Sequence, residues 1–220
     1  DWVFYCNATD GALAQLRRTN GHPEPFGVKF WSVGNERSGR EYIDRVRDTA
    51  RGMKAFDPDL QIMCSGAHGG RHAVVDDYLF GAAADYLDMI SIHNYWTDRG
   101  DSLIRYDYPT AMSKSELPDL YISDTIEALR KAGQLDRLKI SFDEWNLRAW
   151  QHPKFPRNEV EDFNDSEVRE VVEQRRREND LAEQYTMVDA LFSASFLNAC
   201  LRHADTVTMA AVATLVNTRR

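Results

Sequence analysis

Two glutamates, Glu36 and Glu144, each stand close behind a short apolar run and beside an amide side chain. The run at residues 28–33 is followed by Gly, Asn and Glu36, and the run at 138–142 by Asp, Glu144, Trp and Asn. Although 108 residues separate the two glutamates in the sequence, the carboxyl ends of parallel barrel strands meet at one rim. One carboxylic acid at such a rim can protonate a leaving oxygen while the other carboxylate attacks carbon or activates water.

Aromatic and hydrogen-bonding side chains stand near the same strand ends. His93, Tyr95 and Trp96 follow a third apolar run, and Trp145 follows Glu144 directly. Aromatic faces can stack on sugar C–H surfaces, while imidazole and amide groups can bond sugar hydroxyls. A single glutamate at a strand end is most often a solvated loop residue or a charge at a helix N-terminus. The pair in aromatic surroundings instead indicates hydrolysis of a glycosidic bond.

Short apolar runs alternate with amphipathic stretches along the chain, which predicts βαβ units and a parallel sheet. The runs are nearly continuous rather than alternating, as in strands buried on both faces. No glycine-rich phosphate motif follows any strand, so a (β/α)8 TIM barrel is favoured over a nucleotide-binding sheet. The predicted strands are 1–6, 28–33, 60–64, 87–92, 138–142 and 206–210; the predicted helices are 42–53, 74–79, 122–133 and a long one from about 165 to 201.

The chain is expected to be an incomplete barrel, because only about six strands are predicted. It begins in an apolar run and stops just after another. We treat residues 1–220 as one partial catalytic domain of a longer protein. The long polar and aromatic segments 95–117 and 147–164 are candidate binding loops.

Composition excludes several classes of protein. The net charge of −8 argues against a nucleic-acid partner, and no stretch of 18 residues lacks a charge, so no membrane span is expected. Cys6, Cys64 and Cys200 are far apart and include no CxxC, so free thiols are expected rather than disulfides or a zinc site. The histidines have no spacing typical of metal ligands, and no metal or other cofactor is expected.

The motifs resemble those of glycoside hydrolase family 51, whose type activity is α-L-arabinofuranosidase. The similarity runs in order along nearly the whole chain and is carried by Asn-Gly-His-Pro-Glu-Pro-Phe at 20–26, Lys-Phe-Trp-Ser-Val-Gly-Asn-Glu at 29–36, Ile-Ser-Ile-His at 90–93, Phe-Asp-Glu-Trp-Asn at 142–146, Asp-Ala-Leu at 189–191, Phe-Leu-Asn at 196–198 and Leu-Val-Asn at 215–217. The resemblance implies a barrel whose first strands, together with a β-sandwich domain, are absent from this chain.

The resemblance also implies a retaining mechanism in which Glu36 is the general acid/base and Glu144 the nucleophile. Asn35 matches the amide that contacts the sugar 2-hydroxyl, and Tyr95 matches a tyrosine that bonds the nucleophile. Cys6 and Asn7 match residues that line the subsite of the cleaved sugar, and His93, Trp96 and Trp145 are further expected to contact substrate. The chain departs from the family at Ala213-Thr214, where Ala-Gln is common; a shorter side chain there changes the subsite.

The expected reaction is release of arabinofuranose from arabinoxylan or arabinan oligosaccharides of the plant cell wall. An endo-β-1,4-glucanase or β-xylosidase of the same family is the alternative enzyme, and a catalytically silent carbohydrate-binding barrel is the alternative of another class. We expect the longer protein to be a cytoplasmic homo-oligomer with no nucleic-acid or membrane partner.

Overall fold

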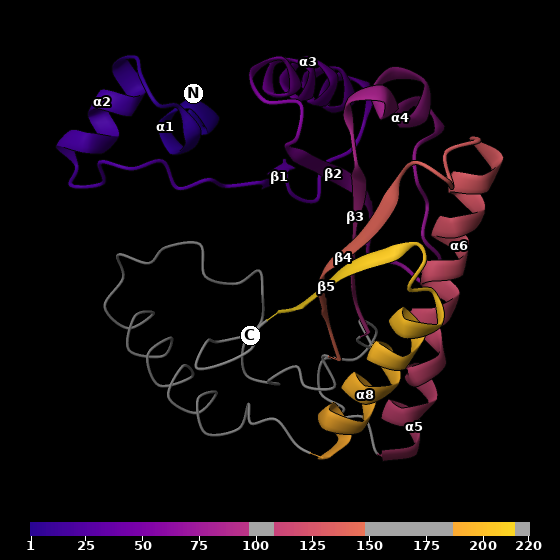
Figure 1. The fold of residues 1–220 in the computed structure, drawn as a ribbon. Helices are drawn as coiled ribbons and strands as arrows, with labels where there is room; N and C mark the ends of the chain where they lie inside the picture. Colours follow the sequence, from indigo (N-terminus) through magenta and orange to yellow (C-terminus); the bar gives the residue numbers. More distant parts are fainter. Residues whose placement is uncertain (97–107, 148–186, 214–220) are drawn as a thin grey trace, which may run out of the picture. The chain divides into compact units, whose positions relative to one another are not determined.

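The computed structural model describes residues 1–96, 108–147 and 187–213 (Figure 1). By its internal contacts the chain divides into two compact units. The first unit comprises Asp1–Ala67, Val74–Ser91 and Glu127–Ser141, and the second comprises His68–Ala73, Ile92–Ile126 and Phe142–Arg220.

The sheet has five strands in the order β1-β2-β3-β4-β5, which is also their order along the chain. β1 and β2 run parallel, with Phe30 opposite Gln61 and Val33 opposite Cys64. A helix stands between each pair of consecutive strands, so the fold is the predicted α/β arrangement with a parallel sheet. The elements are α1 (Trp2–Asn7), α2 (Ala12–Thr19), β1 (Phe30–Val33), α3 (Arg40–Phe56), β2 (Gln61–His68), α4 (Asp77–Ala82), η1 (Ala84–Tyr86), β3 (Met89–Tyr95), α5 (Tyr108–Ser113), η2 (Lys114–Glu116), α6 (Leu117–Lys131), β4 (Lys139–Asn146), α8 (Met187–Arg202) and β5 (Val207–Val212).

The inner strands are buried along continuous stretches. Every residue of β3 from Met89 to Asn94 is buried, and so are Ile62–Ser65 of β2. Continuous burial requires cover on both faces of the sheet, which confirms the interpretation of the apolar runs.

The first apolar run is a helix, so the strand predicted at residues 1–6 is wrong. Tyr5 N donates to Asp1 O and Ala8 N to Phe4 O, the i to i−4 pattern of a helix. Within α1 only Val3 is buried, and Trp2 is 80% exposed. Aromatic and β-branched residues raise β propensity, but here the local helical bonds satisfy this backbone.

A helix that the sequence analysis did not predict, α2, packs against α1. Its Arg17 is fully buried and has backbone carbonyls as partners. Arg17 Nη1 donates to Tyr5 O at 2.8 Å and to Ala8 O at 2.9 Å, and Nε donates to His22 O at 3.2 Å. Arg17 therefore fastens the end of α1 to the segment that leads from α2 towards β1.

The other predicted elements are found with shifted bounds. The helices predicted at 42–53, 74–79 and 122–133 correspond to α3, α4 and α6, and the long helix predicted from about 165 is described only as α8. The predicted loop 95–117 is partly wrong, because Tyr95 ends β3 and residues 108–117 are helical. Residues 97–107, most of the predicted loop 147–164, and the motif at 215–217 with Thr214 lie outside the described residues.

Candidate active site

Glu36 lies on an exposed turn directly after β1, in the first unit. Its φ is +49°, and it is the one non-glycine residue with positive φ in the described chain. Gly34, two residues earlier, has a φ of +88°. Asn35 stands between them on the same exposed turn. The turn thus presents an amide and a carboxyl group to solvent at the carboxyl end of a strand.

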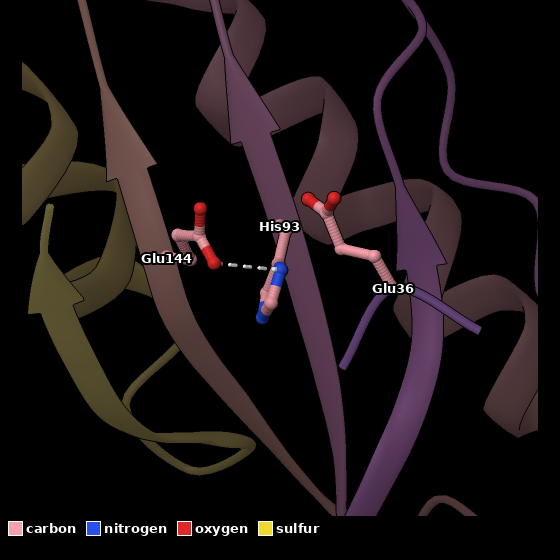
Figure 2. Close-up of side chains that lie close together, drawn as sticks. All are labelled: Glu36, His93 and Glu144. Carbon is pink, nitrogen blue, oxygen red and sulfur yellow. Dashed lines mark ion pairs between the residues drawn. The ribbon is translucent and has the colours of Figure 1, made fainter. Parts of the chain in front are cut away.

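Glu144 lies within β4, and both of its carboxylate oxygens have partners in the second unit. Tyr95 Oη donates a hydrogen bond to Oε1, and His93 Nδ1 lies 3.2 Å from Oε2 (Figure 2). The Glu144 side chain is 29% exposed, whereas that of His93 is 5% exposed. A carboxylate oriented through both oxygens, yet open to solvent, has the geometry that a nucleophile needs.

The His93 ring faces two carboxylates that are adjacent in the sequence. Its Nε2 lies 3.6 Å from Asp143 Oδ1, while its Nδ1 faces Glu144. An imidazole that is protonated forms ion pairs with both. Asp143 is part of the Phe-Asp-Glu-Trp-Asn motif but has no role predicted from the sequence; the signal that could have found it is its position next to Glu144. His93 and Glu144 are of types that bind metal ions, but here their ring nitrogen and carboxylate oxygen pair with each other.

Both tryptophans expected to contact substrate are buried in an aromatic cluster of the second unit. Trp145 is 3% exposed and stacks on Phe196, with ring centroids 3.6 Å apart and planes 13° apart. Trp96 is 4% exposed and contacts Phe142, Phe192 and Phe196. The contact of either tryptophan with a sugar stays a prediction.

A cavity of about 540 Å³ opens beside Tyr95, within the volume range of small-molecule pockets. Part of its wall comes from η2 and the start of α6, in a segment that the sequence analysis treated as a binding loop. The cavity is lined by Gly70, Arg71, Asn94, Tyr95, Trp96, Ser113, Lys114 and Leu117.

Cys6 and Asn7 end α1 in the first unit. Asn7 Nδ2 donates to Val28 O at 2.7 Å, and Val28 N donates to Asn7 Oδ1 at 2.8 Å. The amide therefore joins α1 to the segment that enters β1. Cys6 is partly exposed, and Cys64 and Cys200 are buried; all three are free thiols, as expected. A role for Cys6 and Asn7 in a sugar subsite stays a prediction.

Known proteins match the chain along nearly its whole length. A family model described as α-L-arabinofuranosidase 1 domain matches residues 1–109, and one described as α-L-arabinofuranosidase C-terminal domain matches residues 143–220. The intracellular exo-α-(1→5)-L-arabinofuranosidase of Halalkalibacterium halodurans is 30% identical over 98% of this chain and 43% of the relative. The chain belongs to glycoside hydrolase family 51.

Solved structures of arabinofuranosidases share this fold. An α-L-arabinofuranosidase from Thermotoga maritima, in complex with arabinose, matches with a TM-score of 0.69 and 26% identity over 98% of this chain and 40% of that one. The family 51 arabinofuranosidase from Xanthomonas axonopodis pv. citri has a TM-score of 0.68 and 21% identity, covering 99% of this chain and 43% of its own. The chain thus spans less than half the length of these relatives. Among its described helices, none has the length and apolar character needed to cross a membrane.

Proposed function

We propose that this chain carries the two catalytic carboxylates of a retaining α-L-arabinofuranosidase. The observation that carries the proposal is the Glu144 carboxylate, which Tyr95 and His93 hold through both oxygens at a strand end of a family 51 fold. The fold is proposed to be part of a (β/α)8 barrel, with residues 1–220 forming a single partial catalytic domain.

Glu144 is the proposed nucleophile. Its carboxylate attacks the anomeric carbon of the arabinofuranosyl unit and forms a glycosyl ester as the glycosidic C–O bond breaks. Water then attacks the same carbon and releases Glu144. Two inversions at one carbon give overall retention. The hydrogen bond from Tyr95 and the contact with His93 orient the carboxylate for the first attack.

Glu36 is the proposed general acid/base. It donates its proton to the departing glycosidic oxygen in the first step and accepts a proton from the attacking water in the second. The order of the strands supports this role, because Glu36 follows β1 and Glu144 lies near the carboxyl end of β4 in one sheet. Asn35 is proposed to contact the sugar 2-hydroxyl. A retaining pair predicts a separation of about 5–5.5 Å between the two carboxyl groups in a crystal structure of the full-length protein.

The substrate is proposed to be an arabinoxylan or arabinan oligosaccharide cleaved from its non-reducing end. The relatives from Halalkalibacterium halodurans and Bacillus subtilis are named intracellular exo-α-(1→5)-L-arabinofuranosidases, which supports exo action and a cytoplasmic location. Assembly of the full-length protein as a homo-oligomer is also proposed.

The test uses the full-length protein and its Glu144→Ala, Glu36→Ala and Glu41→Ala variants. Glu41 is a control glutamate, exposed on α3 and paired with Arg45. Glu144→Ala should lower kcat on 4-nitrophenyl α-L-arabinofuranoside by about 10⁴-fold or more, and Glu41→Ala should leave it unchanged. Azide should accelerate Glu36→Ala and yield a glycosyl azide of retained configuration.

Three results would contradict the proposal in different ways. Activity on cellulose or xylosides that exceeds activity on arabinofuranosides would favour the alternative enzymes of the family. Binding of arabino-oligosaccharides without turnover, unaffected by Glu144→Gln, would favour a silent carbohydrate-binding barrel. An inverted first product in the NMR spectrum would exclude the retaining mechanism.

A further inference from the structure

The turn that carries Glu36 has a backbone conformation that an isolated chain would not keep. Left-handed φ values are unfavourable for residues other than glycine, because Cβ approaches the carbonyl oxygen of its own chain. Such conformations persist where surrounding contacts determine them, and they are concentrated at functional sites. The contacts that hold this turn therefore contribute to the function of Glu36.

The side chain of Tyr42, from the first turn of α3, supports the start of the Glu36 turn. Its Oη donates to Val33 O at 2.6 Å and accepts from Ser65 N at 2.9 Å. Its ring lies against Gly34 so closely that a Cβ on that residue would be 2.6 Å from Tyr42 Cε2. Tyr42 thus links Val33, the last residue of β1, to Ser65 of β2, and its ring lies against Gly34.

The end of the turn is held from β2. Ser65 is 6% exposed, and its Oγ accepts a hydrogen bond from Arg37 N at 3.3 Å. Since the backbone N–H of Ser65 also donates to Tyr42 Oη, the two residues form one connected bracket. The bracket reaches Val33 and Arg37, which flank Gly34, Asn35 and Glu36 on both sides.

The bracket keeps its hydrogen bonds throughout the pH range in which glycosidases work. Burial raises the pKa of Tyr42 to about 12, and the nearby Cys64 contributes in the same direction. The hydroxyl therefore remains protonated and donates to Val33 O at neutral and acidic pH alike.

We propose that Tyr42 and Ser65 are positioning residues for general acid catalysis, because they fix the turn from which the Glu36 carboxyl protonates the leaving oxygen. The inference rests on the proposed function of Glu36. It assigns to these two residues a share in the step that depends on proton donation, and none in the attack by Glu144.

The test compares Tyr42→Phe with Tyr78→Phe in the full-length protein. Tyr78→Phe is the matched control, since Tyr78 is also half-buried in the first unit and its Oη makes one hydrogen bond, 2.9 Å to Asp44 Oδ1. Each variant is assayed on an arabino-oligosaccharide, whose leaving group needs protonation, and on a 2,4-dinitrophenyl arabinofuranoside, whose leaving group does not. The ratio of the two kcat/KM values is independent of the amount of folded enzyme, so partial loss of stability does not obscure it.

Tyr42→Phe should lower kcat/KM on the oligosaccharide by about tenfold and leave the dinitrophenyl substrate within about twofold, since misplaced acid groups lose much of their contribution. Ser65→Ala should change the ratio in the same direction, and Tyr78→Phe should not change it. Equal losses on both substrates for Tyr42→Phe and Ser65→Ala would overturn the inference.

Glu36→Gln, assayed in parallel, separates this inference from the proposed function. If kcat/KM depends steeply on the leaving group in Glu36→Gln but not in Tyr42→Phe and Ser65→Ala, the positioning role is refuted and the acid role remains intact. The absence of that dependence in Glu36→Gln itself would refute the acid role.

Discussion

Glu36 and Glu144 occupy opposite kinds of local structure, although the sequence presents them alike. Glu144 belongs to the regular backbone of β4, and its side chain is held by Tyr95 and His93. Glu36 belongs to an exposed turn whose backbone is held by Tyr42 and Ser65. A nucleophile requires a fixed direction of attack, whereas an acid/base gives its proton to the leaving oxygen in the first step and takes one from the attacking water in the second.

The Tyr95 hydroxyl should matter for every substrate. Tyr95→Phe removes a hydrogen bond to a carboxylate, and such bonds are worth about 1.5–3 kcal/mol. We expect kcat to fall by about 10- to 100-fold on the oligosaccharide and on the dinitrophenyl substrate alike, because both reactions need the attack by Glu144. Tyr86→Phe, at a half-buried tyrosine on η1, is the control, and a loss confined to the oligosaccharide would contradict this role.

Gly34 should not accept a side chain. In Gly34→Ala the new Cβ meets the Tyr42 ring at 2.6 Å, and the φ of +88° strains any other residue. We expect the free energy of unfolding in urea to fall by about 2–4 kcal/mol. Gly52→Ala is the control, because its Cβ would meet nothing within 4 Å on α3, and it should preserve or raise stability. Equal stability of the two variants would show that the ring and turn move apart freely.

The residue types at strand ends could be predicted from the sequence, but their supporting contacts could not. Glu36 and Glu144 were found because each follows a continuous apolar run. The bracket of Tyr42 and Ser65 was missed because a tyrosine on an amphipathic helix and a serine at a strand end are ordinary in sequence. Tyr42 and Ser65 are distinguished only by the structure, through the positive φ of Glu36 and the lack of room for a Cβ between Gly34 and the Tyr42 ring.

At the scale of elements, runs that bury both faces of a strand were easier to predict than runs at the edge of the fold. β2 to β4 each contain a stretch of fully buried residues, which leaves little choice of structure. The run in α1 has the same residue types, but it buries only Val3. In a short segment, the residue types alone do not distinguish a strand from a helix. The difference here is how many of the residues are buried.

The packing of Phe196 of α8 in the aromatic cluster leads to a prediction for this helix. Phe196 is fully buried against Trp145, Trp96 and Phe142, whereas its neighbour Leu197 is 46% exposed. Phe196→Ala should lower the free energy of unfolding by about 3–5 kcal/mol, and Leu197→Ala by less than about 1 kcal/mol. Urea titration followed by tryptophan fluorescence measures both. Similar losses would mean that α8 does not hold the cluster.

At the scale of the whole molecule, buried thiol and phenol groups predict that the stability of the fold decreases at alkaline pH. Burial raises the pKa of Cys64 to about 12, of Cys200 to about 11 and of Tyr42 to about 12, from ordinary values of 9.0, 9.0 and 10.0. Above pH 9 the unfolded chain loses these protons before the folded chain does, so deprotonation favours unfolding. The stabilisation is complete below pH 9 and declines as the pH rises towards 11 and 12.

The measurement is the free energy of unfolding in urea between pH 7 and pH 11. The contribution of these three groups to the free energy of unfolding should be nearly constant up to about pH 9 and should then decrease. Cys64→Ala should make the fall above pH 9 shallower than in the unmodified chain. An identical slope in both proteins would show that the Cys64 thiol ionises equally well when folded and unfolded.

The short stretch of chain that contains Glu36, Tyr42 and Ser65 has a consequence for recombination between related enzymes. All three lie in one continuous module, from β1 through α3 to β2. A chimaera that exchanges this module whole inherits the acid together with both of its supports from one parent. A crossover within α3 would instead combine Tyr42 of one parent with Ser65 of the other. The contacts between these two residues would then come from different proteins. Hybrid libraries should therefore retain proton-donating function more often when crossovers fall before Phe30 or after His68.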